Sequence, residues 1–155
     1  MAPHFFRYLL ISVLFASTIP INAQFVATVQ MTEHVEGICD STQVFHLWNT
    51  FDGQKQATCT VSDAAIQARL NSGVTYLKDN PKFKLPKGAS VSTWVNCEGA
   101  LVKVKMESKN AAFNEQVEAV FRDLGEWTAG RTGGKNVDSV RLWGITIYKG
   151  YILLQ

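Results

Sequence analysis

The segment from Ala89 to Glu107 constrains the fold of this chain more than any other feature. Residues alternate between apolar and polar from Ala89 to Asn96, and again from Ala100 to Glu107. The three residues Cys97-Glu98-Gly99 lie between the two runs. Alternation with a period of two is typical of strands with one buried face, and a short glycine-containing connection joins such strands antiparallel. The sequence therefore predicts a β-hairpin that needs a partner layer on its apolar face.

Two amphipathic segments on either side of this hairpin supply that layer. Ser62 can cap a helix whose apolar residues Ile66, Leu70, Val74 and Leu77 recur at helical spacing, and Asn80-Pro81 would end it. Asn110 can cap a second helix that runs to Leu124, with Gly125 as its stop. The basic loop from Lys82 to Gly88 is most simply a solvated connection.

The remaining segments predict further strands. The Asp52-Gly53 turn signal separates two strand-like runs, 37–48 and 54–61, which we expect to pair as an N-terminal hairpin. Val140 to Tyr148 predicts the last long strand, and Lys149-Gly150 turns into a short apolar tail. The expected fold class is α+β, an antiparallel sheet with two helices packed on one face and an extra N-terminal β-hairpin.

The first residues have the layout of a signal peptide. Arg7 is followed by an apolar run from Tyr8 to Phe15 and by small residues up to Ala23. The alternative, an uncleaved membrane anchor, is disfavoured because this run is too short to span roughly 30 Å of hydrocarbon. We expect residues 1–23 to be removed, 24–36 to form an extended arm, and 37–155 to form one domain, with the hairpin extension at 37–61 and the core at 62–148.

Charge and cysteine content narrow the function classes. The expected mature chain carries 14 Lys and Arg against 13 Asp and Glu, so its balance argues for neither nucleic acid nor an anionic surface. Three cysteines in an oxidising compartment predict one disulfide and one free thiol. We expect Cys39 to pair with Cys59, because both lie on neighbouring strand-like runs, and Cys97 to be the free thiol. Three unpaired, buried cysteines are the alternative.

Few residues of the expected mature chain are suited to catalysis or to binding a metal. Only His34 and His46 remain, and neither has a partner at metal-ligand spacing. We therefore expect no metal, no cofactor and no catalytic residue. A nucleophile formed by Cys39 or Cys97 with His46 is the weaker alternative. The glycines between Gly130 and Lys135 precede a strand instead of opening a helix, so they predict tight turns and not a phosphate-binding loop.

One stretch of the chain resembles a known family. After the second predicted helix come Trp127, Ala129-Gly130, Arg131 and Gly134-Lys135-Asn136-Val137, followed by a final strand. This order is similar to the C-terminal domain of TonB, and the similarity extends from about Ala64 to Tyr148. Ala129 and Asn136 stand where that family has prolines. The membrane helix and proline-rich spacer of energy-transducing members are not recognisable, so the resemblance implies a stand-alone exported domain.

The resemblance implies a non-catalytic, periplasmic or secreted protein-binding module that takes peptide segments of envelope or outer-membrane transporter proteins by strand addition. The last strand would be the free edge. Its expected partner-binding residues are Arg141, Leu142, Trp143, Gly144, Ile145 and Thr146, beside a motif loop containing Trp127, Gly130, Gly134, Lys135 and Val137. An alternative of another class is a secreted cystatin-like protease inhibitor, although the glutamine-valine-glycine hairpin of those inhibitors is missing.

Overall fold

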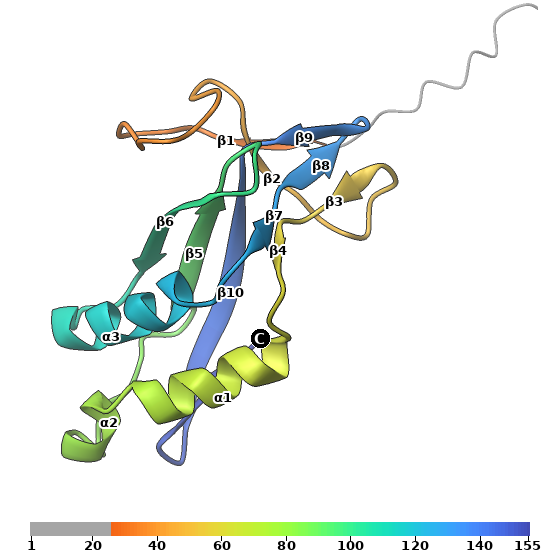
Figure 1. Ribbon diagram of the computed structural model, residues 1–155. Helices are drawn as coiled ribbons and strands as arrows, with labels where there is room; N and C mark the ends of the chain where they lie inside the picture. Colours follow the sequence, from red (N-terminus) through yellow and green to blue (C-terminus); the bar gives the residue numbers. More distant parts are fainter. Residues whose placement is uncertain (1–25) are drawn as a thin grey trace, which may run out of the picture.

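The computed structural model describes residues 26–155, which form a main sheet, two small accessory sheets of three and two short strands, and three helices (Figure 1). The predicted signal peptide, 1–23, lies outside the described residues. None of the helices between residues 26 and 155 has the length and apolar character needed to cross a membrane. The predicted α+β class is confirmed.

The main sheet has the order β1-β2-β10-β5-β6, with β11 also paired to β10. All of its pairings are antiparallel except that of β2 with β10, which is parallel. The predicted all-antiparallel sheet is therefore wrong at this one pairing. The bounds of these strands are β1 Ala27–Val29, β2 Val44–His46, β5 Ser90–Val95, β6 Leu101–Met106, β10 Ser139–Tyr148 and β11 Tyr151–Leu154.

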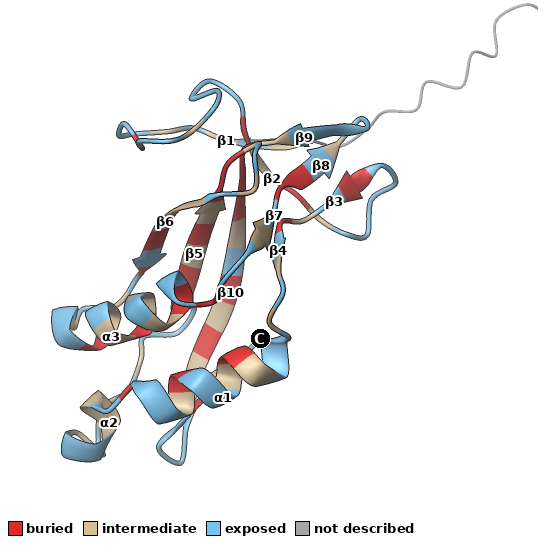
Figure 2. Ribbon diagram, viewed as in Figure 1, coloured by how far each residue is buried: buried red, intermediate tan, exposed pale blue. Residues whose placement is uncertain are grey.

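The predicted hairpin is confirmed as β5 and β6, whose register runs from Val91 opposite Met106 to Val95 opposite Leu101. Buried residues alternate along β5, as Figure 2 shows. A register irregularity lies between Trp94 and Val95, where Lys103 and Leu101 are the successive partners. One extra residue on β6 therefore bends the edge of the sheet at Val102.

Both long helices cover one face of this sheet. Helix α1 (Asp63–Gly73) begins at Ser62, whose Oγ accepts a hydrogen bond from the Ala65 N–H at 3.3 Å. Helix α3 (Ala111–Arg122) begins at Asn110, whose Oδ1 accepts from the Phe113 N–H at 2.9 Å. Both predicted caps are confirmed, because each side chain satisfies an amide that the first turn leaves unpaired.

The first predicted helix is shorter than expected. It ends at Gly73, Val74 is extended, and one further turn forms α2 (Tyr76–Asp79). Glycine lowers helix stability, and the break lets the Val74 side chain reach the core, where it is 3% exposed. The core joins both helices to the sheet; among its fully buried members are Ile66, Leu70, Val91, Phe113, Val117, Phe121 and Ile152.

The predicted N-terminal hairpin over 37–61 is wrong. Strands β3 (Gln54–Lys55) and β4 (Thr58–Cys59) pair with β8 (Gly130–Thr132) and β7 (Trp127–Thr128), and β2 pairs with β1 and β10. The turn between the runs 37–48 and 54–61 is held by hydrogen bonds of side-chain amides, and the two runs form no strand pairing with each other. Gln54 Oε1 accepts from the Trp48 N–H, and Gln56 Nε2 donates to the Leu47 carbonyl at 2.8 Å.

The disulfide joins Cys39 to Cys97, so the predicted Cys39–Cys59 pairing is wrong and Cys59 is the free thiol. The tertiary structure decides this, because Cys59 pairs with Trp127 on the helix side of the sheet. The buried Asp138 carboxylate lies beside the disulfide. It accepts hydrogen bonds from the N–H groups of Cys39, Asp40 and Cys97 at 3.1, 2.7 and 3.0 Å. A disulfide in the chain is compatible with an exported protein.

Candidate functional site

The predicted binding strand, β10, is not a free edge. On one side it pairs with β5 from Ser139 to Gly144, and the Ile145 N–H continues that side by donating to the Ala89 carbonyl at 3.0 Å. On the other side it pairs with β2 at Ser139 and Val140 and with β11 from Ile145 to Tyr148. The prediction of a free ladder from Arg141 to Thr146 is therefore wrong. The apolar tail, which the sequence indicated only as a tail, returns as β11 and covers that side.

The six predicted edge residues have different environments. Trp143 and Ile145 are buried in the core, and the Trp143 Nε1–H donates to Thr93 Oγ1 at 3.1 Å. The Gly144 carbonyl accepts from the Gln155 N–H at 2.9 Å, and Thr146 lies opposite Leu153. Residues 141–143 lie between the pairings of β10 with β2 and with β11, and Leu142 is the exposed one, with its side chain 51% exposed. An opening of three residues between two paired neighbours is too short for a partner strand.

The Arg141 side chain packs on the face of β10 that the helices cover. Its guanidinium lies 3.6 Å from the centre of the Trp143 ring, and Nη2 lies 3.5 Å from the Asp63 carboxylate. Burial lowers the pKa of Arg141 from its ordinary value, while Asp63 acts in the opposite direction. The stacked guanidinium therefore links β10 to the start of α1.

The predicted motif loop forms ordered strands. Trp127 lies in β7; Lys135 and Val137 lie in β9 (Lys135–Val137), which pairs with β8; and Gly134 lies in the turn between β8 and β9. Gly130 is required by close packing, because a Cβ at this position would lie 2.5 Å from Ser139 Oγ. Of the motif residues, Gly130 thus packs against β10, at Ser139.

Strand β6 is one of the two end strands of the main sheet, β1 being the other, and it lies beside α3 (Figure 1). The Glu107 N–H donates to the Ser90 carbonyl, and the Asn96 N–H donates to the Ala100 carbonyl. Hydrogen-bonded and non-hydrogen-bonded pairs alternate in an antiparallel ladder. The main-chain groups of Leu101, Val104 and Met106 therefore point away from β5, and no strand of the described residues pairs with them.

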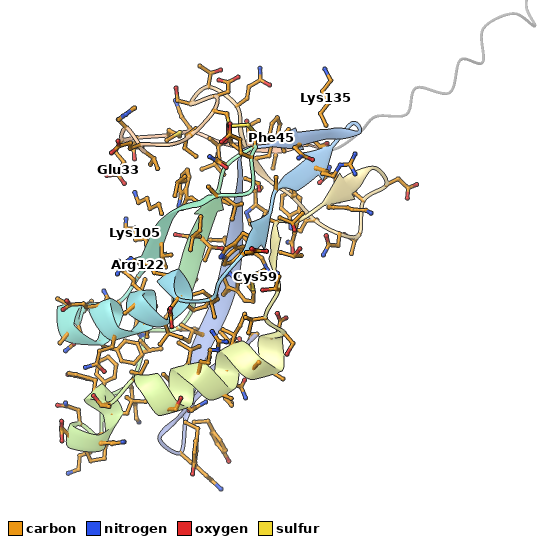
Figure 3. All side chains as sticks on the ribbon, in the orientation of Figure 1. Glu33, Phe45, Cys59, Lys105, Arg122 and Lys135 are labelled. Carbon is orange, nitrogen blue, oxygen red and sulfur yellow. A yellow bond between two sulfur atoms is a disulfide. The ribbon has the colours of Figure 1, made fainter. Side chains whose placement is uncertain are left out.

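One end of this edge is closed by a side chain. Glu118 of α3 accepts a hydrogen bond from the outward Met106 N–H at 2.9 Å, and its other oxygen pairs with Arg122. The other end, at Leu101 and Val104, has no such cap among the described residues. Figure 3 shows Lys105 and Arg122, from β6 and α3, on the side of the molecule where this edge lies.

A cleft of about 630 Å³ follows the open part of this edge. One wall is β6 with its preceding turn, from Gly99 to Val104, and the other wall contains Arg122, Gly125, Glu126 and Trp127. The Trp127 indole N–H is buried and donates to no acceptor among the described residues. Buried indole N–H groups usually have an acceptor. The cleft thus combines an open main-chain edge with an unpaired donor in its wall.

The N-terminal arm lies beside the same edge. Glu33 forms an ion pair with Lys103, and the Gly37 carbonyl accepts from Asn96 Nδ2 at 2.8 Å. A Cβ on Gly37 would lie 2.9 Å from Val102 Cγ1, so the arm packs directly on the bulged part of β6. Sequence reasoning missed this site, although the alternation of β6 indicated the strand that forms it.

The cysteines and histidines considered from the sequence can be located within residues 26–155. Cys39, Cys97 and Asp138 form the one group of three metal-ligating residue types among these residues, and the disulfide removes both thiolates. The same disulfide removes the Cys39 and Cys97 nucleophiles considered from the sequence. His46 lies 4.5 Å from the Trp48 ring, and burial lowers its pKa.

Comparison with known proteins adds no assignment, because no protein-family model, no curated protein and no solved structure matches this chain. The class defined by the structure is an α+β domain with one disulfide, and its candidate site is the cleft along β6.

Proposed function

We propose that this chain is a non-catalytic, exported protein-binding module that takes an extended peptide as an additional strand along β6. The observation that carries the proposal is the outward main chain of Leu101 and Val104 beside a cleft. Strand addition needs unpaired donors and acceptors on the host edge, and side-chain pockets beside the ladder give specificity. The TonB resemblance implied strand addition at β10, and we propose the same binding mode at β6 instead.

The cleft gives this edge a means of selecting its partner. Side chains of an added strand alternate between its two faces, so every second one would enter the space between β6 and Trp127. Arg122 and Glu126 lie at that wall and would favour polar or charged groups at the peptide positions beside them. By the family resemblance, the peptides would come from envelope or outer-membrane transporter proteins in the periplasm.

The main test compares two variants at one residue. Peptides selected from a random display library against residues 24–155 would be measured with Val104→Pro and Val104→Ala. Both variants remove the branched valine side chain, but only proline also removes the outward N–H, and it leaves the ladder to β5 intact. We expect about tenfold weaker binding for Val104→Pro and little change for Val104→Ala, since tenfold corresponds to about one hydrogen bond.

Amide exchange gives an independent readout of the same site. In the free protein, the amides of Leu101 and Val104 should exchange faster than those of Lys103 and Lys105, which face β5. A bound peptide should slow Leu101 and Val104 selectively. Equal binding by both Val104 variants, with no added protection on β6, would rule out strand addition at this edge.

A further inference from the structure

Positive charge is concentrated at one end of the molecule, although the net charge of the whole chain is close to zero. Helix α2, the loop 80–88 and the turn between β10 and β11 lie at the same end in Figure 1. These segments carry five exposed lysines and one carboxylate, Asp79; the lysines are Lys78, Lys82, Lys84, Lys87 and Lys149. The remaining described residues carry nine Lys and Arg against twelve Asp and Glu. The near-neutral total therefore conceals a basic end, which we name the lysine end.

The ammonium groups of the lysines in α2 and in the loop 80–88 have no charged partner among the described residues. Among the described residues, the side chains of Lys78, Lys82, Lys84 and Lys87 take part in no hydrogen bond or ion pair, whereas Lys103 and Lys105 of β6 are both paired with glutamates. Four such ammonium groups within ten residues repel one another unless counter-charges are near. A negatively charged partner would relieve that repulsion.

Two aromatic side chains project from the same end. Tyr148 and Tyr151 are 60% and 65% exposed, the largest values among the exposed large hydrophobic residues of the described chain. They lie directly opposite each other across the β10–β11 hairpin, on either side of Lys149 and Gly150. The Lys149 ammonium lies 5.3 Å from the centre of the Tyr148 ring. Tyrosine beside lysine is the combination that prefers the boundary between lipid headgroups and water.

A hollow of about 310 Å³ lies between this hairpin and the helices. Lys78 of α2 and Lys149 of the turn both line it, together with Asn71, Leu77 and Tyr151. Two ammonium groups beside a phenol ring can hold an anionic headgroup while its apolar chain stays outside. This hollow joins α2, through Lys78, to the β10–β11 turn that carries Lys149 and Tyr151.

We propose that the lysine end docks the protein on a membrane surface rich in anionic lipid, with Tyr148 and Tyr151 at the headgroup level. Each lysine near such a surface contributes attraction within a Debye length, and two interfacial tyrosines add apolar contact. The proposal does not rest on peptide binding, because the cleft along β6 is lined by none of these residues.

The test uses residues 24–155, because every described element and the whole core lie within that segment. Binding to vesicles of phosphatidylcholine alone would be compared with binding to vesicles of equal parts phosphatidylcholine and phosphatidylglycerol, by co-sedimentation. We expect binding to the anionic vesicles only, with a steep loss as salt is raised.

A matched pair of double variants assigns the surface. Lys82→Gln with Lys84→Gln should weaken vesicle partition about tenfold or more. Lys55→Gln with Lys135→Gln removes the same charge from exposed residues of β3 and β9, away from the lysine end, and should change partition little (Figure 1). Circular dichroism and thermal melting of both double variants serve as the check that the fold is intact.

Two further measurements separate the lipid surface from other anions. Partition that persists in excess inorganic phosphate supports docking on a surface, and complete displacement by phosphate would overturn it in favour of a small-anion site. Equal partition to both vesicle types, or equal losses for the two double variants, would also overturn the proposal. Binding to polyglutamate at the same salt without binding to anionic vesicles would assign the lysine end to an acidic protein instead.

Discussion

Asp138 is the residue whose replacement tests most directly how the N-terminal arm is held to the sheet. Its carboxylate is 2% exposed and accepts three main-chain hydrogen bonds, at 2.7 to 3.1 Å. Two of the donors, the N–H groups of Cys39 and Cys97, belong to the disulfide itself, and the third belongs to Asp40. Asp138→Ala removes all three acceptors, whereas Asp138→Asn keeps one oxygen and places an amide NH₂ against the remaining donor.

The hydrogen-bond distances to Asp138 allow an estimate of the free energy of unfolding that each variant loses. A hydrogen bond to a charged group contributes about 1.5–3 kcal/mol, and the least buried donor regains water after the change. We therefore expect Asp138→Ala to lower the free energy of unfolding by about 3–5 kcal/mol, and Asp138→Asn by about 1.5–3 kcal/mol. Small domains have about 5–15 kcal/mol in total, so the alanine variant should be marginally stable.

The assay is urea unfolding of oxidised protein, followed by tryptophan fluorescence and by circular dichroism to test for two-state behaviour. Asp40→Asn is the matched control, because the Asp40 side chain is exposed and accepts hydrogen bonds from the nearby residues Thr42 and Gln43. Its effect should be much smaller. A loss below about 1 kcal/mol for Asp138→Ala, which is the scale of an ordinary surface substitution, would refute the reasoning.

Two further predictions concern the contact of α1 with β11 and the dependence of stability on pH. Asn71 of α1 donates to the Ile152 carbonyl at 2.9 Å and accepts from its N–H at 2.8 Å, so Asn71→Ala should cost about 1–3 kcal/mol and increase self-association in size-exclusion chromatography; unchanged elution and stability would show that water replaces the amide. Burial lowers the pKa of His46 below the ordinary 6.5, so the unfolded chain binds this proton more readily. The contribution of neutral His46 to stability should be fully present above about pH 6.5 and should decline as the pH falls toward the lower folded-state pKa. The decline should be smaller in His46→Gln. Identical urea midpoints in the two proteins across this range would contradict the assignment.

The elements with local signals were predicted well. The β5–β6 hairpin follows from alternation over adjacent residues, and the starts of α1 and α3 follow from the caps at Ser62 and Asn110, which act within one turn. The apolar spacing continues to Leu77 and therefore predicts a longer helix, whereas α1 ends at Gly73. Periodicity records which side chains face the core and not whether the backbone between them stays helical.

The candidate site could not be predicted, because it depends on which strand lies at the edge. The sequence favoured β10 from its length and its apolar residues. The tail after Gly150 pairs back onto β10, and β2 reaches it from nearly one hundred residues earlier in the chain. Neither pairing has a local signal, since register and neighbour choice depend on packing across the whole sheet.

By itself, the sequence determined the α+β class, the central hairpin and the two helices that cover it, because period, capping and turn chemistry act over a few residues. The tertiary structure alone decided the Cys39–Cys97 pairing, the burial of β10, the open edge at Leu101 and Val104, and the placing of Lys149 and the two exposed tyrosines beside the basic loop. These four features join segments distant in sequence, and a one-dimensional pattern does not contain the distances between such segments.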